Sequence, residues 1–492
     1  MKTKKYLDIA LKSCTAALLA VSLILSFTVS DYYIFNRIGL LNSGIDKFSV
    51  FFVFSQWIKK AGLLLLPLAV FYKKKSCADI AKYVLPVFTV LSLCTFGNFF
   101  DITMMTGGAD PVQDTFASIN EFIPKAANIT FFCISCVLIA AVCALLFVRD
   151  GFKVNKRSFI FLPFALIGVM PLNIFENFFD ISKFSRTHFL WFRNFTLWHF
   201  LALAILAGVT VAGYYLLKNR DKDKQQDYLV AVAIALLIQY HSKDSVIMGD
   251  GYNVYNSVFS CIPLFICNIG VYVASISVIL KKRVLYAISF FVHAAGALTV
   301  FFYFGKDEMS NYGIIFSYSI LYFCLTHCLL FVLCVLPSAL RHYKFTPRDC
   351  VIPLIYYCLV IVAATVVGGL LTTFIQNYSY NGYTLTIGEY GTGADMAPLN
   401  FAFTQVNPLP IPFYYIPFKI ADCTFYLSYL IALYLVYVGL FWIFTGSYYA
   451  FLAIRKKVLK APALPVAPEV PAEAPAALAE AAVADATDDK EE

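Results

Sequence analysis

One cysteine and two histidines in apolar stretches are the residues of this chain whose side chains could perform chemistry. Cys267 follows Pro263 in one apolar stretch, and His327 and His199 lie in two others. An imidazole can take the proton of a thiol, and the resulting thiolate can attack an acyl carbon. A histidine in an apolar helix can equally serve to hydrogen-bond a neighbouring helix, and cysteine is common where helices pack. The residue types alone leave both roles open.

The proline before Cys267 bears on the shape of its surroundings. If residues 258–280 form one membrane-spanning helix, Pro263 near its start frees a backbone carbonyl and favours a kink. At a rise of about 1.5 Å per residue, Cys267 is then roughly 13 Å below the outer surface, and His327 is roughly 22 Å deep in a parallel helix. This arrangement predicts a pocket beside the thiol that opens toward the outer leaflet.

The elements that must position these residues are indicated by the composition. Hydrophobic residues make up 60% of the 492-residue chain, charged residues make up 14%, and the mean hydropathy is +0.73. This balance excludes a soluble domain. A helix needs about 20 apolar residues to cross a bilayer, and the chain contains many apolar segments of about that length. Apolar segments lie near residues 8–30, 48–72, 80–100, 126–148, 158–178, 195–217, 227–241, 258–280, 284–304, 312–337, 349–373 and 412–452. The sequence predicts an all-α, polytopic transmembrane bundle of about twelve spans.

The basic residues indicate how this bundle is oriented. They gather in short loops, and if every segment spans once, all these loops and the N-terminal lysines fall on one side. The positive-inside rule then makes both termini cytoplasmic. We expect an integral protein of the bacterial plasma membrane whose basic loops face lipid headgroups, with no nucleic-acid partner.

Repeats and composition predict three parts. Phe96–Ile102 (FGNFFDI) resembles Phe175–Ile181 (FENFFDI), which indicates a duplicated hairpin in a five-span module at residues 1–182. A seven-span domain is expected at residues 183–457. Residues 458–492 are rich in Ala, Pro and acidic residues, and such a segment buries too little apolar surface to fold. This tail either binds a protein partner or only solubilises the chain.

The seven-span part holds most of the intramembrane polar residues. Ionisable or strongly hydrogen-bonding groups are costly in a bilayer and commonly mark functional sites. They include His199, His293, His327 and a pair formed by Lys419 and Asp422, which are three residues apart and would share one helical face. We therefore expect the chemistry of this protein in its C-terminal half.

Several short motifs of this half occur in the same order in a known family. They are Thr196-Leu197-Trp198-His199, the Pro263–Asn268 stretch, Gly296-Ala297-Leu298, the Phe323–Leu330 stretch around His327, and Asn377-Tyr378. The region from about 190 to 455 resembles the YwaF-like integral membrane proteins, the family that includes the eukaryotic transmembrane protein 164. The five N-terminal spans fall outside this resemblance.

The resemblance implies a cysteine-dependent acyltransferase that acts on phospholipids. By position, Cys267 would accept the acyl chain, and His327 or His199 would assist proton transfer. Asn268 and Asn377 could donate hydrogen bonds to an oxyanion. We expect no metal and no cofactor. One departure matters, because the family has a histidine two residues before the cysteine where this chain has Phe265.

Two functions of other classes remain open. About twelve spans with a parallel repeat also fit a secondary transporter, in which repeats frame a site near the midplane. A non-enzymatic scaffold of a membrane complex, with the acidic tail as its contact, is the third hypothesis.

Overall fold

The computed structural model describes most of the apolar segments of the chain. The described residues are 2–26, 47–104, 125–170, 190–249, 262–302, 315, 317–377, 379–380, 383–384, 401–404 and 414–458. The expected boundary at residue 182, the second copy of the repeated motif and the acidic tail lie outside them. The chain forms two compact units, Met1–Phe441 and Trp442–Glu492, and the features below belong to the first.

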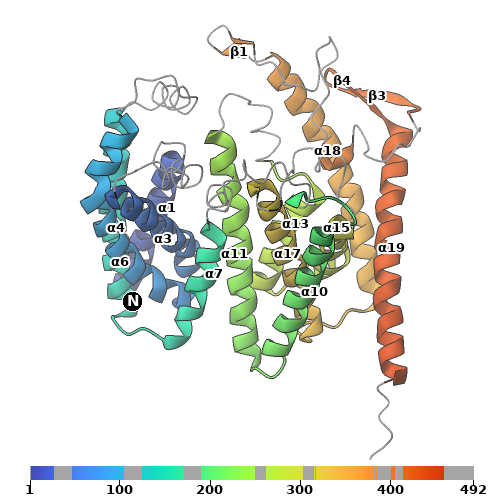
Figure 1. Ribbon diagram of the computed structural model, residues 1–492, viewed down its shortest axis with the longest axis horizontal. Helices are drawn as coiled ribbons and strands as arrows, with labels where there is room; N and C mark the ends of the chain where they lie inside the picture. Colours follow the sequence, from blue (N-terminus) through green and yellow to red (C-terminus); the bar gives the residue numbers. More distant parts are fainter. Residues whose placement is uncertain are drawn as a thin grey trace, which may run out of the picture. The chain divides into compact units, whose positions relative to one another are not determined.

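Helices account for nearly all of the described structure (Figure 1). In chain order they are α1 (Lys2–Ser26), α3 (Lys47–Val70), α4 (Lys75–Met104), α6 (Lys125–Asp150), η2 (Lys156–Ile160), α7 (Phe161–Val169), α10 (Leu197–Leu217), α11 (Lys222–Gly249), α13 (Ile266–Leu280), α14 (Arg283–Ile288), the π-helical turn η4 (Ser289–Ala294), α15 (Ala295–Phe302), α17 (Tyr318–Ala339), η5 (Pro347–Cys350), α18 (Val351–Asn377), η6 (Phe401–Phe403) and α19 (Leu427–Val458). Two small antiparallel hairpins complete it, β1 (Ser379–Tyr380) with β2 (Tyr383–Thr384) and β3 (Pro417–Ile420) with β4 (Cys423–Tyr426).

The described helices fit a multi-pass membrane protein. Seven stretches within them are long and apolar enough to cross a bilayer, namely Lys75–Cys94, Ile129–Asp150, Leu197–Leu217, Arg283–Phe302, Ile320–Ala339, Arg348–Thr373 and Leu427–Ala453. The all-helical class and the membrane location are thereby confirmed. The expected total of about twelve crossings and the cytoplasmic location of both termini stay predictions.

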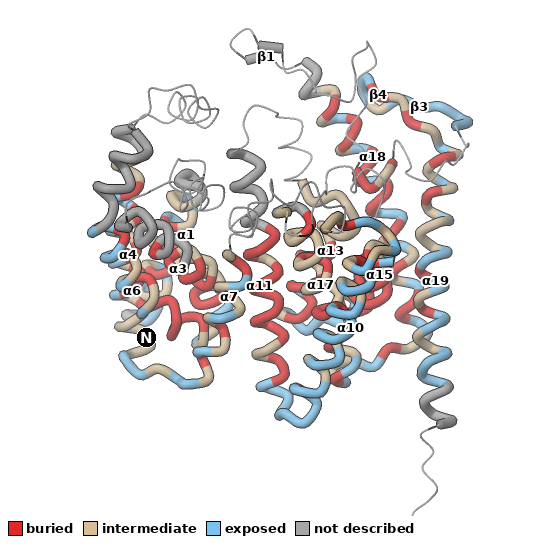
Figure 2. Tube along the Cα trace, viewed as in Figure 1, coloured by how far each residue is buried: buried red, intermediate tan, exposed pale blue. Residues whose placement is uncertain are grey.

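The helices of the C-terminal half pack around α17. It contacts α10, α11, α13, η4 and α15. Figure 2 shows that α11 is mainly buried, whereas α10 is mainly exposed. An apolar helix with an exposed face is expected where that face meets lipid, because the bilayer and not water is its solvent.

Two expected spans differ from the structure. Within the described part of the span expected at 258–280, which begins at Ile262, the helix starts at Ile266, so Pro263 precedes α13 instead of kinking it. The span expected at 412–452 opens with the β3–β4 hairpin before α19 begins at Leu427. Lys419 lies in β3 and Asp422 lies in the turn, so the prediction that they share a helical face is wrong. A proline at the start of β3 and the two-residue turn favour a hairpin over a helix here.

The loops that carry basic clusters meet at one end of the helices, called here the basic end. The ammonium group of Lys74 is 3.2 Å from the carboxylate of Asp227, and Arg157 is 2.8 Å from the same carboxylate. Lys222 donates a hydrogen bond to the carbonyl of Leu340 at 2.5 Å. Three basic loops are therefore joined to the start of α11.

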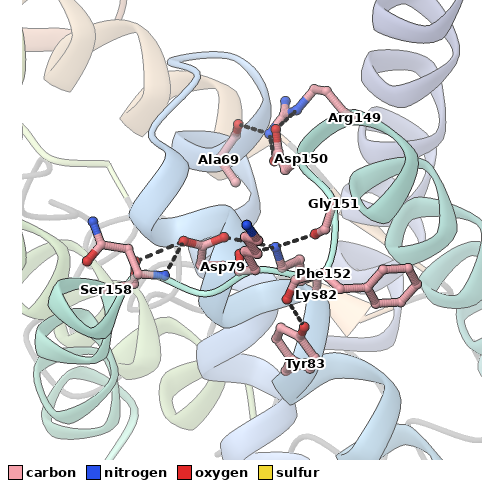
Figure 3. A network of polar contacts seen from close by, with 11 residues as sticks. Ala69, Asp79, Lys82, Tyr83, Arg149, Asp150, Gly151, Phe152 and Ser158 are labelled. Carbon is pink, nitrogen blue, oxygen red and sulfur yellow. Dashed lines mark hydrogen bonds and ion pairs between the residues drawn. The ribbon is translucent and has the colours of Figure 1, made fainter. Parts of the chain in front are cut away.

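A buried ion pair holds the N-terminal helices at this end (Figure 3). Lys82 and Asp79, one turn apart on α4, are both fully buried, with Nζ 2.9 Å from the carboxylate. Nζ also donates to the carbonyls of Gly151 and Lys153 at 2.8 and 3.3 Å. The pair thus fastens the loop after α6 to α4.

The other carboxylate oxygen of Asp79 completes this network. It accepts hydrogen bonds from the backbone N–H of Asn155 at 3.3 Å and the hydroxyl of Ser158 at 3.1 Å. Every polar atom of Lys82 and Asp79 has a partner in the loop or on the same helix, and buried charges persist where they are satisfied in this way. The pair therefore has a structural role, because it holds the segment after α6 against α4.

Candidate functional site

Cys267 is the second residue of α13 and lies in the first turn of that helix. Phe265 precedes the helix in an extended conformation, with φ −79° and ψ 144°, and its carbonyl accepts the N–H of Ile269 at 2.9 Å. The first N–H groups of a helix have no intrahelical acceptor, and they carry the positive end of its dipole. The thiol is therefore attached where backbone N–H groups and positive potential concentrate.

Several other elements converge on this thiol. A Cβ added to Gly296 on α15 would lie 3.9 Å from Sγ of Cys267. The thiol is also within electrostatic range of Cys334 on α17, Tyr357 on α18 and Tyr437 on α19. Cys267 nevertheless keeps intermediate exposure. It therefore lies among the helices of the C-terminal half without being sealed by them.

His293 packs against the same turn of α13. It is 0% exposed within the π-helical turn η4, and its Nε2 is 3.1 Å from the hydroxyl of Tyr356. Its Nδ1 faces the backbone of Ile266 without a well-aligned hydrogen bond. A Cβ at Gly270 would lie 2.7 Å from that nitrogen. Single π-helical turns are frequent at functional sites, since they redirect side chains of an otherwise regular helix.

The sequence marks His293 as an intramembrane polar residue without indicating a role for it. Nothing in the residue spacing shows that the ring lies against the helix of Cys267, because the π-helical turn changes which face of the segment it occupies. A histidine 26 positions after the cysteine is the only trace of this neighbour in the sequence.

His199 is bonded at both ring nitrogens to backbone atoms. The N–H of Phe195 donates to Nδ1 at 2.9 Å, and Nε2 is 2.6 Å from the carbonyl of Phe301. Because Nδ1 accepts, Nε2 carries the proton and donates it to that carbonyl. In this arrangement the neutral ring joins the start of α10 to α15.

His327 lies in the middle of α17, where it is 8% exposed. Its Nδ1 is 2.8 Å from the carbonyl of Phe323, so Nδ1 carries the proton and donates it. Cys334, the neighbour of Cys267 on α17, is seven residues farther along. That spacing places both residues on one face of the helix, roughly 10 Å apart along its axis.

The two asparagines lie at helix ends. Asn268 directly follows Cys267 in the first turn of α13 and is partly exposed. Asn377 is the last residue of α18, and its side chain lies outside the described part of the chain. The structure thus brings Asn268 to the thiol by chain connectivity, and the position of the Asn377 amide stays a prediction.

All the predicted site residues belong to one continuous stretch, from α10 to the end of α18. Residues 194–437 match the TMEM164 family. The match begins just before α10 and ends within α19, so it confirms the resemblance of the C-terminal half and leaves residues 1–193 outside. No curated protein and no solved structure matches the chain.

Phe265 stands in the TMEM164-like half where the family pattern has a histidine. Its ring centroid is 6.2 Å from that of Phe401 and 5.7 Å from that of Phe403, both in edge-to-face geometry. Such aromatic pairs stabilise an apolar contact and supply no proton acceptor. Two histidines lie on helical elements that contact α13, namely His293 on η4 and His327 on α17.

The cysteines and charged groups do not assemble a metal site in the part of the chain that is described. Within those residues no group of three or more His, Cys, Asp and Glu side chains is arranged to hold an ion, and no cysteine is in a disulfide.

Proposed function

We propose that this TMEM164-like protein transfers acyl chains between membrane lipids through a thioester at Cys267. The observation that carries the proposal is the position of the thiol, which is partly exposed in the first turn of α13, the helix against which the buried imidazole of His293 packs at Gly270. The family match over residues 194–437 agrees with a membrane-embedded substrate.

The start of α13 supplies what a thioester mechanism needs. Its positive dipole end favours the thiolate over the thiol, and helix N-termini are known to activate cysteines. In the proposed mechanism its N–H groups and the Asn268 amide stabilise negative charge on a carbonyl oxygen near Sγ.

The proposed reaction has two symmetric halves. An imidazole, His293 or His327, takes the proton of the Cys267 thiol, and the thiolate attacks the ester carbonyl carbon of a phospholipid. The ester C–O bond breaks, and the departing lysophospholipid oxygen takes the proton from the imidazolium. A hydroxyl of a second lysophospholipid then attacks the thioester, its proton passes to the imidazole, and the thiol is restored. His199, bonded to backbone at both nitrogens, supports the site by positioning α10, and Asn377 is a further proposed donor.

The test is acyl exchange by the full-length protein in lipid nanodiscs. Phosphatidylcholine with a deuterated acyl chain serves as donor and lysophosphatidylethanolamine as acceptor, and mass spectrometry follows the label. Cys267→Ala should abolish transfer and any hydroxylamine-sensitive label on the protein. Cys334→Ala is the matched control, because this neighbouring thiol is 3% exposed and should not be needed. Transfer that persists in Cys267→Ala would refute the proposal.

The transporter hypothesis receives less support. Its intramembrane charge pair, Lys419 and Asp422, consists of exposed residues of the β3–β4 hairpin. Uptake into reconstituted vesicles that depends on Lys419 or Asp422 and not on Cys267 would favour transport over acyl transfer.

A further inference from the structure

A short segment at Phe401–Thr404, called here the gate segment, lies near the start of α13, the helix that carries Cys267. Phe401 and Ala402 are 0% and 1% exposed. Together with Val360 and Ala364 they form a core cluster against which Phe265 and Ile266 pack, the two residues that precede the cysteine in the chain. The ring centroids of Phe401 and Phe265 are 6.2 Å apart. Phe401 thus occupies an apolar position next to the first turn of α13.

The backbone of the gate segment is held in an unfavourable conformation. Ala402 has φ 49° and Phe403 has φ 60°, two consecutive non-glycine residues in the left-handed region. A side chain with a Cβ disfavours this region, because the Cβ crowds the following carbonyl. Such a conformation persists only when its surroundings hold it, and it is common at switch regions.

Two tyrosines of α19 hold this conformation. The hydroxyl of Tyr437 donates to the carbonyl of Ala402 at 2.9 Å, and the hydroxyl of Tyr429 donates to the carbonyl of Phe403 at 2.8 Å. Tyr437 is also within electrostatic range of Cys267. The residue that holds the Ala402 carbonyl therefore also lies near the thiol.

We propose that Phe401–Thr404 is a gate whose closed state, seen in this structure, leaves Cys267 only partly exposed, and that the gate moves away from the start of α13 when the two tyrosine hydrogen bonds break. An acyl chain then takes the apolar position of Phe401 and brings its carbonyl to the thiol. The nature of the ligand rests on the proposed acyl transfer, whereas the movement of the gate does not. Stored backbone strain favours opening, and the two hydroxyls and the Phe401 contacts favour closure.

The accessibility of the Cys267 thiol tests this gate. The full-length protein in lipid nanodiscs is treated with N-ethylmaleimide, and peptide mass spectrometry gives the alkylation rate of Cys267. Tyr437→Phe and Tyr429→Phe should each raise that rate about fivefold, since each removes one hydrogen bond of the closed state. Ala402→Gly should lower it severalfold, because glycine relieves the strain of the closed state.

Tyr434→Phe is the matched control on the same helix. Its hydroxyl donates to the carbonyl of Leu354 on α18 at 3.4 Å and does not contact the gate segment, so its loss should leave the rate unchanged. An unchanged rate in both gate tyrosine variants, or equal acceleration in Tyr434→Phe, would overturn the proposal. If the tyrosine variants fail to fold, Ala402→Gly alone tests the gate proposal. An unchanged or higher alkylation rate of Cys267 in that variant would contradict the proposal.

The gate proposal and the acyl-transfer proposal can be refuted independently of each other. Alkylation of Cys267 requires no lipid substrate, so a gated thiol without Cys267-dependent acyl exchange would refute only the proposed reaction. Cys267-dependent exchange with alkylation rates unaffected by the gate variants would refute only the gate.

Discussion

Gly270 and His293 approach so closely that a methyl group on Gly270 would lie 2.7 Å from Nδ1 of the imidazole. The ring is fully buried and cannot move aside cheaply, because its Nε2 is tied to Tyr356. We expect Gly270→Ala to lower the free energy of unfolding by about 1–3 kcal/mol, as overpacking usually does. Thermal unfolding in detergent measures this change.

A second glycine provides the control for this prediction. Gly208 on α10 has no atom within 4 Å of an added Cβ, so Gly208→Ala should be neutral or raise stability by roughly 0.5–1 kcal/mol through the helix propensity of alanine. The double variant Gly270→Ala with His293→Ala should recover part of the loss. A Gly270→Ala protein as stable as Gly208→Ala would show that His293 does not pack on this turn.

The space in front of the Cys267 thiol depends on Gly296. An alanine Cβ there would be in ordinary contact, at 3.9 Å from Sγ and 3.7 Å from Ile266. Gly296→Ala should therefore leave alkylation of Cys267 nearly unchanged, whereas the longer side chain of Gly296→Leu should slow it at least tenfold by filling that space. Peptide mass spectrometry after maleimide treatment measures both rates. Equal rates in the two variants would place the approach to the thiol elsewhere.

The buried pair of Lys82 and Asp79 should stabilise the folded protein when intact, whereas either buried charge without its partner should destabilise it. Lys82→Met leaves a buried carboxylate without its cation, and we expect the free energy of unfolding to fall by about 3–5 kcal/mol. Asp79→Leu in the Lys82→Met background should restore part of this stability, because no buried charge then remains unpaired. Chemical denaturation in detergent compares the three variants. A double variant less stable than Lys82→Met would contradict this account of the network.

His342 at the basic end should make stability depend on pH. Burial, and then the nearby charges of Lys222 and Lys281, lower the pKa of its imidazole from 6.5 to about 4. Its Nε2 is 2.9 Å from the amide oxygen of Gln225, a contact that joins the loop after α17 to α11. The unfolded chain takes up a proton at a higher pH than the folded protein does, so stability is present above pH 6.5 and is lost as the pH falls toward 4.

The corresponding measurement is the unfolding midpoint of wild type and His342→Gln at pH 7 and pH 5. Glutamine cannot titrate and keeps a donor for Gln225. We expect the midpoint of His342→Gln to fall less between the two pH values than that of wild type. Parallel curves would show that His342 does not contribute to the acid sensitivity.

The positions of the helices followed closely from hydrophobicity. Each of the twelve apolar segments contains a described helix, because a backbone in hydrocarbon must satisfy its own hydrogen bonds. For two segments the predicted start of the helix is wrong, at Pro263 and before Leu427. At both places the chain is not yet helical although its side chains are largely apolar, so hydropathy gives no sign of where the helix begins.

Part of the proposed site is accessible from the sequence. Cys267 was named from its residue type and family pattern, and the structure moved it from inside a span to the first turn of α13. His293 was missed as a partner, and so was the gate segment. The ion pair of Asp79 and Lys82 is predictable from the sequence, because the two residues are three positions apart at the start of an apolar stretch.

The sequence by itself determined that the protein resides in a membrane, which half resembles the TMEM164 family and which thiol is the candidate nucleophile. These properties depend on composition and local order along the chain. Only the tertiary structure decided which imidazole lies against the helix of Cys267 and that Phe401 fills the neighbouring apolar position. Such contacts join residues far apart in sequence, and their geometry is set by helix packing, by the π-helical turn at His293 and by the strained backbone at Ala402.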